Sequence, residues 1–165
     1  MLARTTPEME FNEVLMMHRY IGKDKPTFFE WGSGGSTVNF APHTSRYVSI
    51  EHYDKWYELI KPLICDHVEY ELIPNNNPRS KRDTPKEDFL DYVNAVDRFQ
   101  GQKFDLVLVD GRARKYCAER ALSLLHQDSY LFIHDWGREH YTDHVMKYYD
   151  IVEVIESLAC FKSKK

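Results

Sequence analysis

The chain has 165 residues, of which 42% are hydrophobic, 29% charged and 14% aromatic. This length suffices for one domain with a hydrophobic core, and so rich an aromatic content excludes a disordered chain. The net charge of −4 argues against a nucleic-acid binder held by bulk positive charge. No apolar run approaches 18 residues, so we expect neither a membrane span nor a signal peptide. Three widely spaced cysteines fit no disulfide framework or zinc site, and we expect a single cytoplasmic domain over residues 1–165.

The first half of the chain alternates helical and strand-like segments. A helix is expected over residues 6–22, with Thr6 as its cap and Pro7 at its first helical position. Two short apolar strands, each with an acid near its end, are expected at residues 27–31 and 46–51. A helix follows at 54–64, a third strand at 68–73 and a polar loop with three prolines at 74–85.

The second half continues this alternation and closes with a pair of strands. Residues 104–110 are almost continuously apolar, as a central parallel strand must be when both of its faces are covered. Helices are expected at residues 88–99, 113–125 and 138–148. A fifth strand is expected at 130–135, and two terminal strands at 150–157 and 158–161. Strands that alternate with helices predict an α/β fold, a doubly wound and mostly parallel sheet with helices on both faces.

Four acids lie at the ends of predicted strands: Glu30, Glu51, Asp110 and Asp135. In doubly wound sheets the ligand binds beyond the carboxyl ends of the strands, at the point where the strand order reverses. One such acid is adequately explained as a cap of a loop or helix. Four acids at the same edge of one sheet indicate a ligand site.

A glycine-rich turn follows the first strand. Glycine permits a tight turn and lets a ligand approach the backbone closely. Glu51 lies 19 residues after Gly32, at the end of the next strand, where an acid can hydrogen-bond both hydroxyls of a ribose. The turn and this acid together predict a nucleotide-like ligand held by Glu30, Trp31, Gly32, Ser33, Gly34, Gly35 and Ser36.

Two classes of cofactor use such a turn. A dinucleotide cofactor requires glycine or alanine where this chain has Thr37, and Glu30 would face its pyrophosphate with like charge. S-adenosylmethionine carries an ammonium and a sulfonium and no phosphate, so the acid suits it. An NAD(P)-dependent reductase stays as the alternative, and a non-catalytic binding module that keeps the cofactor fold is a third reading, against which the four intact acids count.

The pattern Glu30-x-Gly32-x-Gly34-x-Ser36 resembles the first motif of class I S-adenosylmethionine-dependent methyltransferases. Glu51 is similar to their ribose-binding acid, Asp110 to the acid that ends their fourth strand, and the closing strand pair to their antiparallel hairpin. The resemblance extends over about residues 6–162. It implies a Rossmann-like sheet of seven strands, methyl transfer, and a cofactor bound by residues 30–36, Glu51, His52 and Asp110.

The ends of the fourth and fifth strands resemble those of metal-assisted O-methyltransferases of the catechol and antibiotic-sugar types, and more briefly those of plant glucuronoxylan methyltransferases. The resemblance implies that Asp110, His134 and Asp135 hold Mg²⁺. His134 departs from the pattern, which usually has an acid at this position, and imidazole suits Mn²⁺ better than Mg²⁺. In the metal-free alternative Asp110 contacts the cofactor amine, His134 is the general base and Asp135 is its structural partner.

We expect the acceptor to be a hydroxyl of a small molecule or a carbohydrate. An alcohol loses its proton as it attacks the methyl carbon, so a base or a metal must assist. Arg112 and Arg138 lie just past strand ends and offer donors to a hydroxyl-rich or anionic acceptor. Because the chain is close to a bare cofactor-binding core, we expect the loops at 74–85 and 111–115, a second copy of the chain or further domains to complete an open acceptor site.

Overall fold

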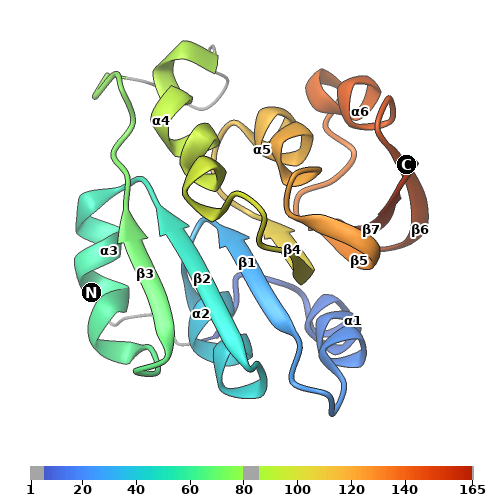
Figure 1. The fold of residues 1–165 in the computed structure, drawn as a ribbon, viewed down its shortest axis with the longest axis horizontal. Helices are drawn as coiled ribbons and strands as arrows, with labels where there is room; N and C mark the ends of the chain where they lie inside the picture. Colours follow the sequence, from blue (N-terminus) through green and yellow to red (C-terminus); the bar gives the residue numbers. More distant parts are fainter. Residues whose placement is uncertain (1–5, 80–85, 165) are drawn as a thin grey trace.

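A computed structural model describes residues 6–79 and 86–164, without the side chains of residues 139–141 (Figure 1). Its centre is a seven-stranded sheet in the order β3-β2-β1-β4-β5-β7-β6. The strands are β1 Thr27–Trp31, β2 Arg46–Glu51, β3 Val68–Leu72, β4 Phe104–Val109, β5 Leu125–Ile133, β6 Tyr149–Ile155 and β7 Leu158–Ser163. The first five strands pair in parallel, while β7 pairs antiparallel with both β5 and β6. The predicted seven-stranded sheet with a C-terminal antiparallel hairpin is confirmed.

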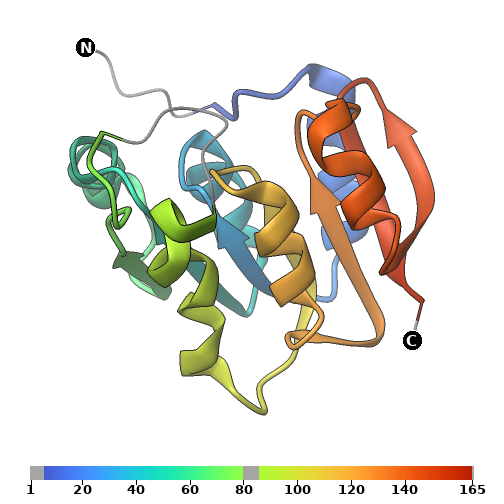
Figure 2. The ribbon, with the colours of Figure 1, turned by 90° about the horizontal axis from the view of Figure 1, so that it is seen from above.

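Helices cover both faces of the sheet (Figure 2). The α-helices are α1 Phe11–Ile21, α2 Gly35–Phe40, α3 Asp54–Ile60, α4 Leu90–Val93, α5 Arg114–Ala121 and α6 Glu139–Val145. Residues of α1 and α2 pack on one face, against Phe28, Leu106 and Phe132. Residues of α4, α5 and α6 pack on the other, against Phe29 and Val107. No helix among the residues described has the length and apolar character needed to cross a membrane.

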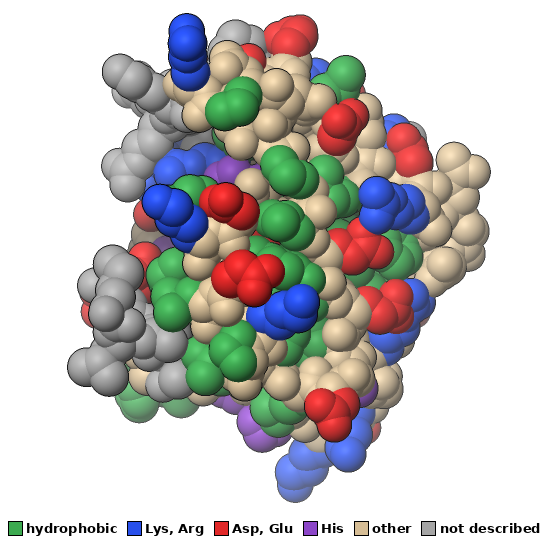
Figure 3. Space-filling view, turned by 90° about the vertical axis from the view of Figure 1, so that its left-hand side faces the viewer, with side chains coloured by type: hydrophobic (Ala, Val, Ile, Leu, Met, Phe, Trp, Pro, Cys, Tyr) green, Lys and Arg blue, Asp and Glu red, His purple; other side chains and the backbone are tan. Residues whose placement is uncertain are grey.

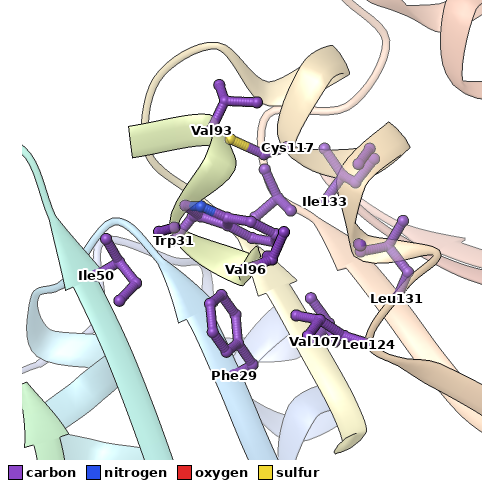
Figure 4. Close-up of a cluster of buried hydrophobic side chains, with 14 of the residues drawn as sticks. Phe29, Trp31, Ile50, Val93, Val96, Val107, Cys117, Leu124, Leu131 and Ile133 are labelled. Atoms are coloured by element: carbon purple, nitrogen blue, oxygen red, sulfur yellow. The ribbon is translucent and has the colours of Figure 1, made fainter. Parts of the chain in front are cut away.

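The larger core lies between the sheet and α4 and α5 (Figure 4). Trp31 at the end of β1 is fully buried there, and its indole N–H donates to the carbonyl oxygen of Tyr92 at 3.0 Å. On the opposite margin of the molecule, β3 is an edge strand without a fully buried residue. In the view of this margin hydrophobic side chains are interspersed with charged ones (Figure 3).

The first helix begins later than the sequence predicts. It starts at Phe11 and not at residue 6, because Glu13 accepts a hydrogen bond from the backbone N–H of Glu10 at 2.8 Å and so fixes the first turn there. The Thr6 carbonyl instead passes so close to Gly35 that a Cβ on that glycine would lie 1.9 Å from it. Residues 6–10 therefore cross the start of α2.

Two other predicted helices, and the strand predicted over 130–135, differ from the structure. The predicted helix over 88–99 is a single α-helical turn between 3₁₀ segments at Lys86–Phe89 and Asn94–Phe99. The predicted helix over 113–125 ends at Ala121, and β5 already begins at Leu125. Ser129 explains the early strand, since its hydroxyl accepts from the His126 N–H at 2.8 Å and donates to the Phe104 carbonyl at 2.6 Å.

Candidate functional site

A cavity of about 650 Å³ opens at the carboxyl ends of the strands. It lies where the strand order reverses, since β1 is flanked by β2 on one side and β4 on the other. The predicted site residues that line it are Gly32, Ser33, Gly34, Gly35, Ser36, Glu51, His52, Asp110, Arg112, His134, Asp135 and Arg138. Asn75 and Pro78 of the predicted loop also line it, while residues 80–85 lie outside the part of the chain that is described.

Glu30 and Trp31 do not line this cavity. Glu30 is fully buried below the glycine turn and accepts hydrogen bonds from the hydroxyls of Ser36, Thr37 and Ser49 at 2.5, 2.6 and 2.7 Å. Burial raises the pKa of Glu30 to about 7, against the opposing effect of these three hydroxyls. Glu30 thus ties the turn and the first residues of α2 to the sheet.

Two glycines let the turns after β1 and β4 cross each other. Gly32 has φ of +92°, and a Cβ there would lie 2.4 Å from the backbone nitrogen of Gly111. A Cβ on Gly111 would lie 2.0 Å from the hydroxyl of Tyr92 and 3.1 Å from the Cα of Gly32. The close approach brings the glycine turn and Asp110 to the same side of the cavity. Gly111 was missed in the sequence because a lone glycine after a strand carries no spacing signal.

Glu51 forms the β2 side of the cavity. Its Oε2 accepts from the Ser33 N–H and hydroxyl, both at 2.9 Å, and its Oε1 accepts from the N–H groups of His52 and Tyr53, both at 2.8 Å. Burial opposes the charge of this carboxylate, but the bonds from His52, Tyr53 and Ser33 outweigh burial and lower the pKa of Glu51. A fixed carboxylate therefore lies beside the glycine turn.

Aromatic residues that the sequence did not single out stand around Glu51. Trp56 donates its indole N–H to the Ser33 carbonyl at 2.7 Å, and its ring lies 3.7 Å from the Cβ position of Gly34. Tyr53 and Phe89 also line the cavity, and the His52 ring meets Phe89 edge-on at 5.5 Å. The helical spacing of Trp56 conceals this role, since such spacing is also that of a core residue.

Asp110 and His134 line the opposite side of the cavity, and His134 links Asp110 to Glu13 behind it. His134 Nδ1 lies 2.9 Å from Asp110 Oδ1, and its Nε2 lies 3.2 Å from Glu13 Oε2. Burial disfavours the imidazolium, but the hydrogen bond to Asp110 and the charges of Asp110, Glu13 and Asp135 prevail and raise the pKa of His134. Because each ring nitrogen faces a carboxylate, the arrangement favours an imidazolium that donates from both nitrogens.

Asp135 is held by two guanidinium groups. Its Oδ2 lies 2.9 Å from Arg114 Nη2 and 2.6 Å from Arg138 Nη2. Burial opposes its charge, while Arg114, His134 and Arg138 lower the pKa of Asp135. Asp135 also has φ of +53°, a left-handed conformation that is uncommon outside glycine and that concentrates at functional sites.

These pairings do not fit the predicted metal site. His134 already faces Asp110 and Glu13, and two guanidinium groups at Asp135 would repel a divalent cation. Among the residues described, no three His, Cys, Asp or Glu side chains are placed to hold a metal ion. The prediction that Asp110, His134 and Asp135 bind Mg²⁺ or Mn²⁺ therefore has no support in this arrangement.

A second cavity of about 570 Å³ adjoins the first and shares Glu8, His134 and Asp135 with it. Residues 6–10, Glu13 and Ser157 complete its lining. Four of the lining residues are acids: Glu8, Glu10, Glu13 and Asp135. The N-terminal segment thus forms one wall of a cavity that continues from the glycine turn past His134.

No family model matches the sequence, and no curated protein matches it. Solved structures do. A methyltransferase-like protein from Silicibacter pomeroyi DSS-3 has 24% identity and a TM-score of 0.75 over 97% of this chain and 90% of its own. The N-methyltransferase NodS from Bradyrhizobium japonicum WM9, in complex with S-adenosylhomocysteine, has 13% identity and a TM-score of 0.60 over 93% and 86%.

The fold is that of the class I methyltransferases. A further structure with this likeness is the 1,6-didemethyltoxoflavin-N1-methyltransferase from Burkholderia thailandensis with bound S-adenosylhomocysteine, which has 11% identity and a TM-score of 0.60 over 94% of this chain and 78% of its own. The methyltransferase fold differs from the dinucleotide-binding order 3-2-1-4-5-6 by its antiparallel β7, which lies between β5 and β6 in this chain.

Proposed function

We propose that the chain transfers the methyl group of S-adenosylmethionine to a hydroxyl of a small-molecule or carbohydrate acceptor. The observation that supports this most is the single cavity at the switch point, which unites an ionised acid beside the glycine turn with Asp110 and His134 on its other side. A class I methyltransferase fold with this cavity also favours S-adenosylmethionine over a dinucleotide, and methyl transfer over a binding role alone.

Each part of the cofactor has a counterpart in the cavity. Glu51 would hold the ribose hydroxyls, and the backbone of residues 32–36 would surround the methionine part. His52, Tyr53 and Phe89 offer apolar ring surface for the adenine next to Glu51. Asp110, at the end of β4, would attract the cofactor's ammonium and sulfonium charges.

Asp110 is also the group best placed to take the acceptor proton. Its Oδ1 is engaged by His134 and by Arg114 at 3.3 Å, whereas the described part of the chain forms no hydrogen bond to Oδ2. As the acceptor oxygen bonds to the methyl carbon, the carbon–sulfur bond breaks, its electron pair stays on sulfur, and the acceptor proton passes to Oδ2. His134 then acts as a fixed cation beside Asp110 and not as the base.

An amine acceptor is the second candidate, and the adjoining acidic cavity favours it. Glu8 and Glu10 in its wall would attract a cationic amine, and two structures of the same fold are N-methyltransferases. The two candidates separate by experiment: labelled S-adenosylmethionine is offered with a panel of sugars and phenols and with a panel of amines. Label on an oxygen supports the proposal, and label only on nitrogen replaces it with the second candidate.

The cofactor assignment is tested by calorimetry with S-adenosylhomocysteine. We expect the wild-type chain to bind it and not to respond to NADH or NADPH. Glu51→Ala should weaken this binding about 10- to 100-fold, since a lost hydrogen bond to a charged group is worth about 1.5–3 kcal/mol. Glu69→Ala, which removes a surface acid paired with Arg46, should leave binding unchanged. A wild-type chain that binds no S-adenosylhomocysteine would sink the proposal.

A further inference from the structure

Arg114 lies at the centre of the β4 and β5 strand ends, where the sequence suggests only a hydrogen-bond donor for the acceptor. Its Nε donates to the Gly111 carbonyl at 3.0 Å, and its Nη2 contacts the Asp110 carbonyl at 3.2 Å. Its Nη1 donates to the His134 carbonyl. Nη2 also lies 3.3 Å from Asp110 Oδ1 and 2.9 Å from Asp135 Oδ2. One guanidinium therefore collects five oxygens from two strand ends.

The position of Arg114 runs against the local preference of the helix. Arg114 is the first residue of α5, where the helix dipole favours an acid, and α5 has no acid in its first turn. The residue before it, Ala113, has φ of +52°, a left-handed conformation that costs energy outside glycine. A cation at an unfavourable helix position, next to a strained residue, indicates that the surrounding oxygens are the reason for an arginine at this position.

The side chain is also nearly enclosed, with only 12% of it exposed. The linked cluster contains three acids, Glu13, Asp110 and Asp135, and three cations, His134, Arg114 and Arg138. Its charge is balanced when His134 is protonated. A divalent ion would add two positive charges to a balanced cluster, next to a guanidinium that already holds the oxygens it would need.

We propose that Arg114 is the built-in cation of this site: a positioning residue that joins the ends of β4 and β5 through five oxygen contacts and takes the place of a divalent metal ion. Its significance for methyl transfer rests on the proposed function, since Asp110 is the group that it positions there. The organisation of the two strand ends is a property of the chain itself and is tested without cofactor or acceptor.

The first measurement titrates MnCl₂ into the wild-type chain and follows uptake by calorimetry and by the Mn²⁺ electron paramagnetic resonance signal. We expect no saturable site, and no change in the thermal unfolding temperature with EDTA or MnCl₂. Saturable uptake of Mn²⁺ by the wild type that Asp135→Asn abolishes would overturn the proposal, because Arg114 and the metal cannot hold the same oxygens.

The second measurement removes the guanidinium. Arg114→Ala is combined with Arg138→Ala, because Arg138 Nη2 lies 2.6 Å from Asp135 Oδ2 and would otherwise still neutralise that carboxylate. In this double variant the Asp135 carboxylate and the carbonyl oxygens of Asp110, Gly111 and His134 lose their cation, and oxygen donors of this kind suit Mn²⁺. We expect the double variant to gain a saturable Mn²⁺ site that Asp135→Asn removes again, and Arg138→Ala alone to gain none. Arg120→Ala is the matched control: it removes another arginine of α5, one paired only with Asp97 in the ion pairs described, and should gain none.

Arg114→Lys is a second, more conservative variant that tests the proposal if the alanine variant does not fold. It keeps one positive charge but not the fork that contacts both strands, so we expect a lower unfolding temperature and still no Mn²⁺ site. An Arg114→Ala/Arg138→Ala chain with native circular dichroism and no Mn²⁺ uptake would overturn the proposal, as would Arg114→Lys with wild-type stability. The result is separate from the fate of the proposed function, because failure of S-adenosylhomocysteine to bind sinks only the latter.

Discussion

At the scale of single residues, the crossing of the turns after β1 and β4 leaves no room for a side chain. The Gly111 position faces the hydroxyl of Tyr92, which is buried and has no hydrogen-bond partner among the residues described. A buried hydroxyl without a partner costs stability, and this one lies where a Cβ on Gly111 would be placed. The fit of these two residues determines how closely Asp110 approaches the glycine turn.

Gly111→Ala should destabilise the fold by about 1–3 kcal/mol, the usual cost of overpacking a closely packed site. Tyr92→Phe removes the clashing oxygen, so the double variant should recover much of that loss in urea unfolding. Tyr92→Phe alone should not lower stability, because it removes a buried hydroxyl without a partner. Additive losses in the double variant would contradict this account.

At the scale of elements, the Glu13 side chain links the start of α1 to the edge of the sheet at which the cavities open. The Glu13 carboxylate is fully buried and accepts from the Glu10 N–H at 2.8 Å, from the Ser157 N–H at 2.7 Å and from the Ser157 hydroxyl at 2.8 Å, besides facing His134. It thereby joins the start of α1, the turn between β6 and β7, and the end of β5. Burial opposes its charge, but these bonds and His134 lower the pKa of Glu13.

Glu13→Gln should lower the pKa of His134, because it removes one of the charges that hold the imidazolium. The raised pKa of His134 stabilises the fold fully below about pH 6.5, and this stabilisation is lost as the pH rises through the folded-state pKa. The imidazole titration is followed by nuclear magnetic resonance. Ser157→Ala, which removes only the hydroxyl on the other oxygen of Glu13, should leave that titration in place. An unchanged His134 titration in Glu13→Gln would show that Glu13 has no electrostatic role.

At the scale of the whole molecule, the buried carboxyl of Glu30 lies between β1, β2 and the start of α2. An acid whose folded pKa is raised is ionised more readily in the unfolded chain, so it lowers stability as the pH rises between the two pKa values. For Glu30 that window runs from about pH 4.5, its ordinary value, to about pH 7. A shift of this size corresponds to about 3 kcal/mol at its largest.

Glu30→Gln should remove this part of the pH dependence. We expect the wild type to lose stability relative to the variant between about pH 5 and 7, by no more than about 3 kcal/mol, and the difference to level off above pH 7. Urea unfolding at several pH values measures it. A wild type that gains stability relative to Glu30→Gln as the pH rises from 5 to 7 would show the opposite sign and refute the assignment.

The seven-stranded sheet was expected from the resemblance to class I methyltransferases, and the strand order confirms it. The sequence by itself determined the order of the strands along the chain, and it placed residues 32–36 and Glu51 at the cavity that they line. These features depend on local signals: apolar runs, a glycine turn directly after a strand, and Glu51 at a fixed distance from it. The carboxyl ends of parallel strands meet at one edge, so strand order alone brings Glu51, Asp110 and Asp135 together. The roles of these residues in binding and catalysis stay predictions.

Only the tertiary structure decided how the charges at that edge are paired. Glu13 and His134 are 121 residues apart, and no spacing pattern in the sequence predicts their contact. Glu30 is a second example: the sequence predicts that it contacts the ligand, but it is buried below the glycine turn and holds that turn to the sheet. Arg114 is a third, because its partners come from the ends of both β4 and β5. Hydrogen bonds and ion pairs depend on ångström-scale distances, which register and packing set. These distances pair Asp110 and Asp135 with His134, Arg114 and Arg138, and not with one another around a metal ion.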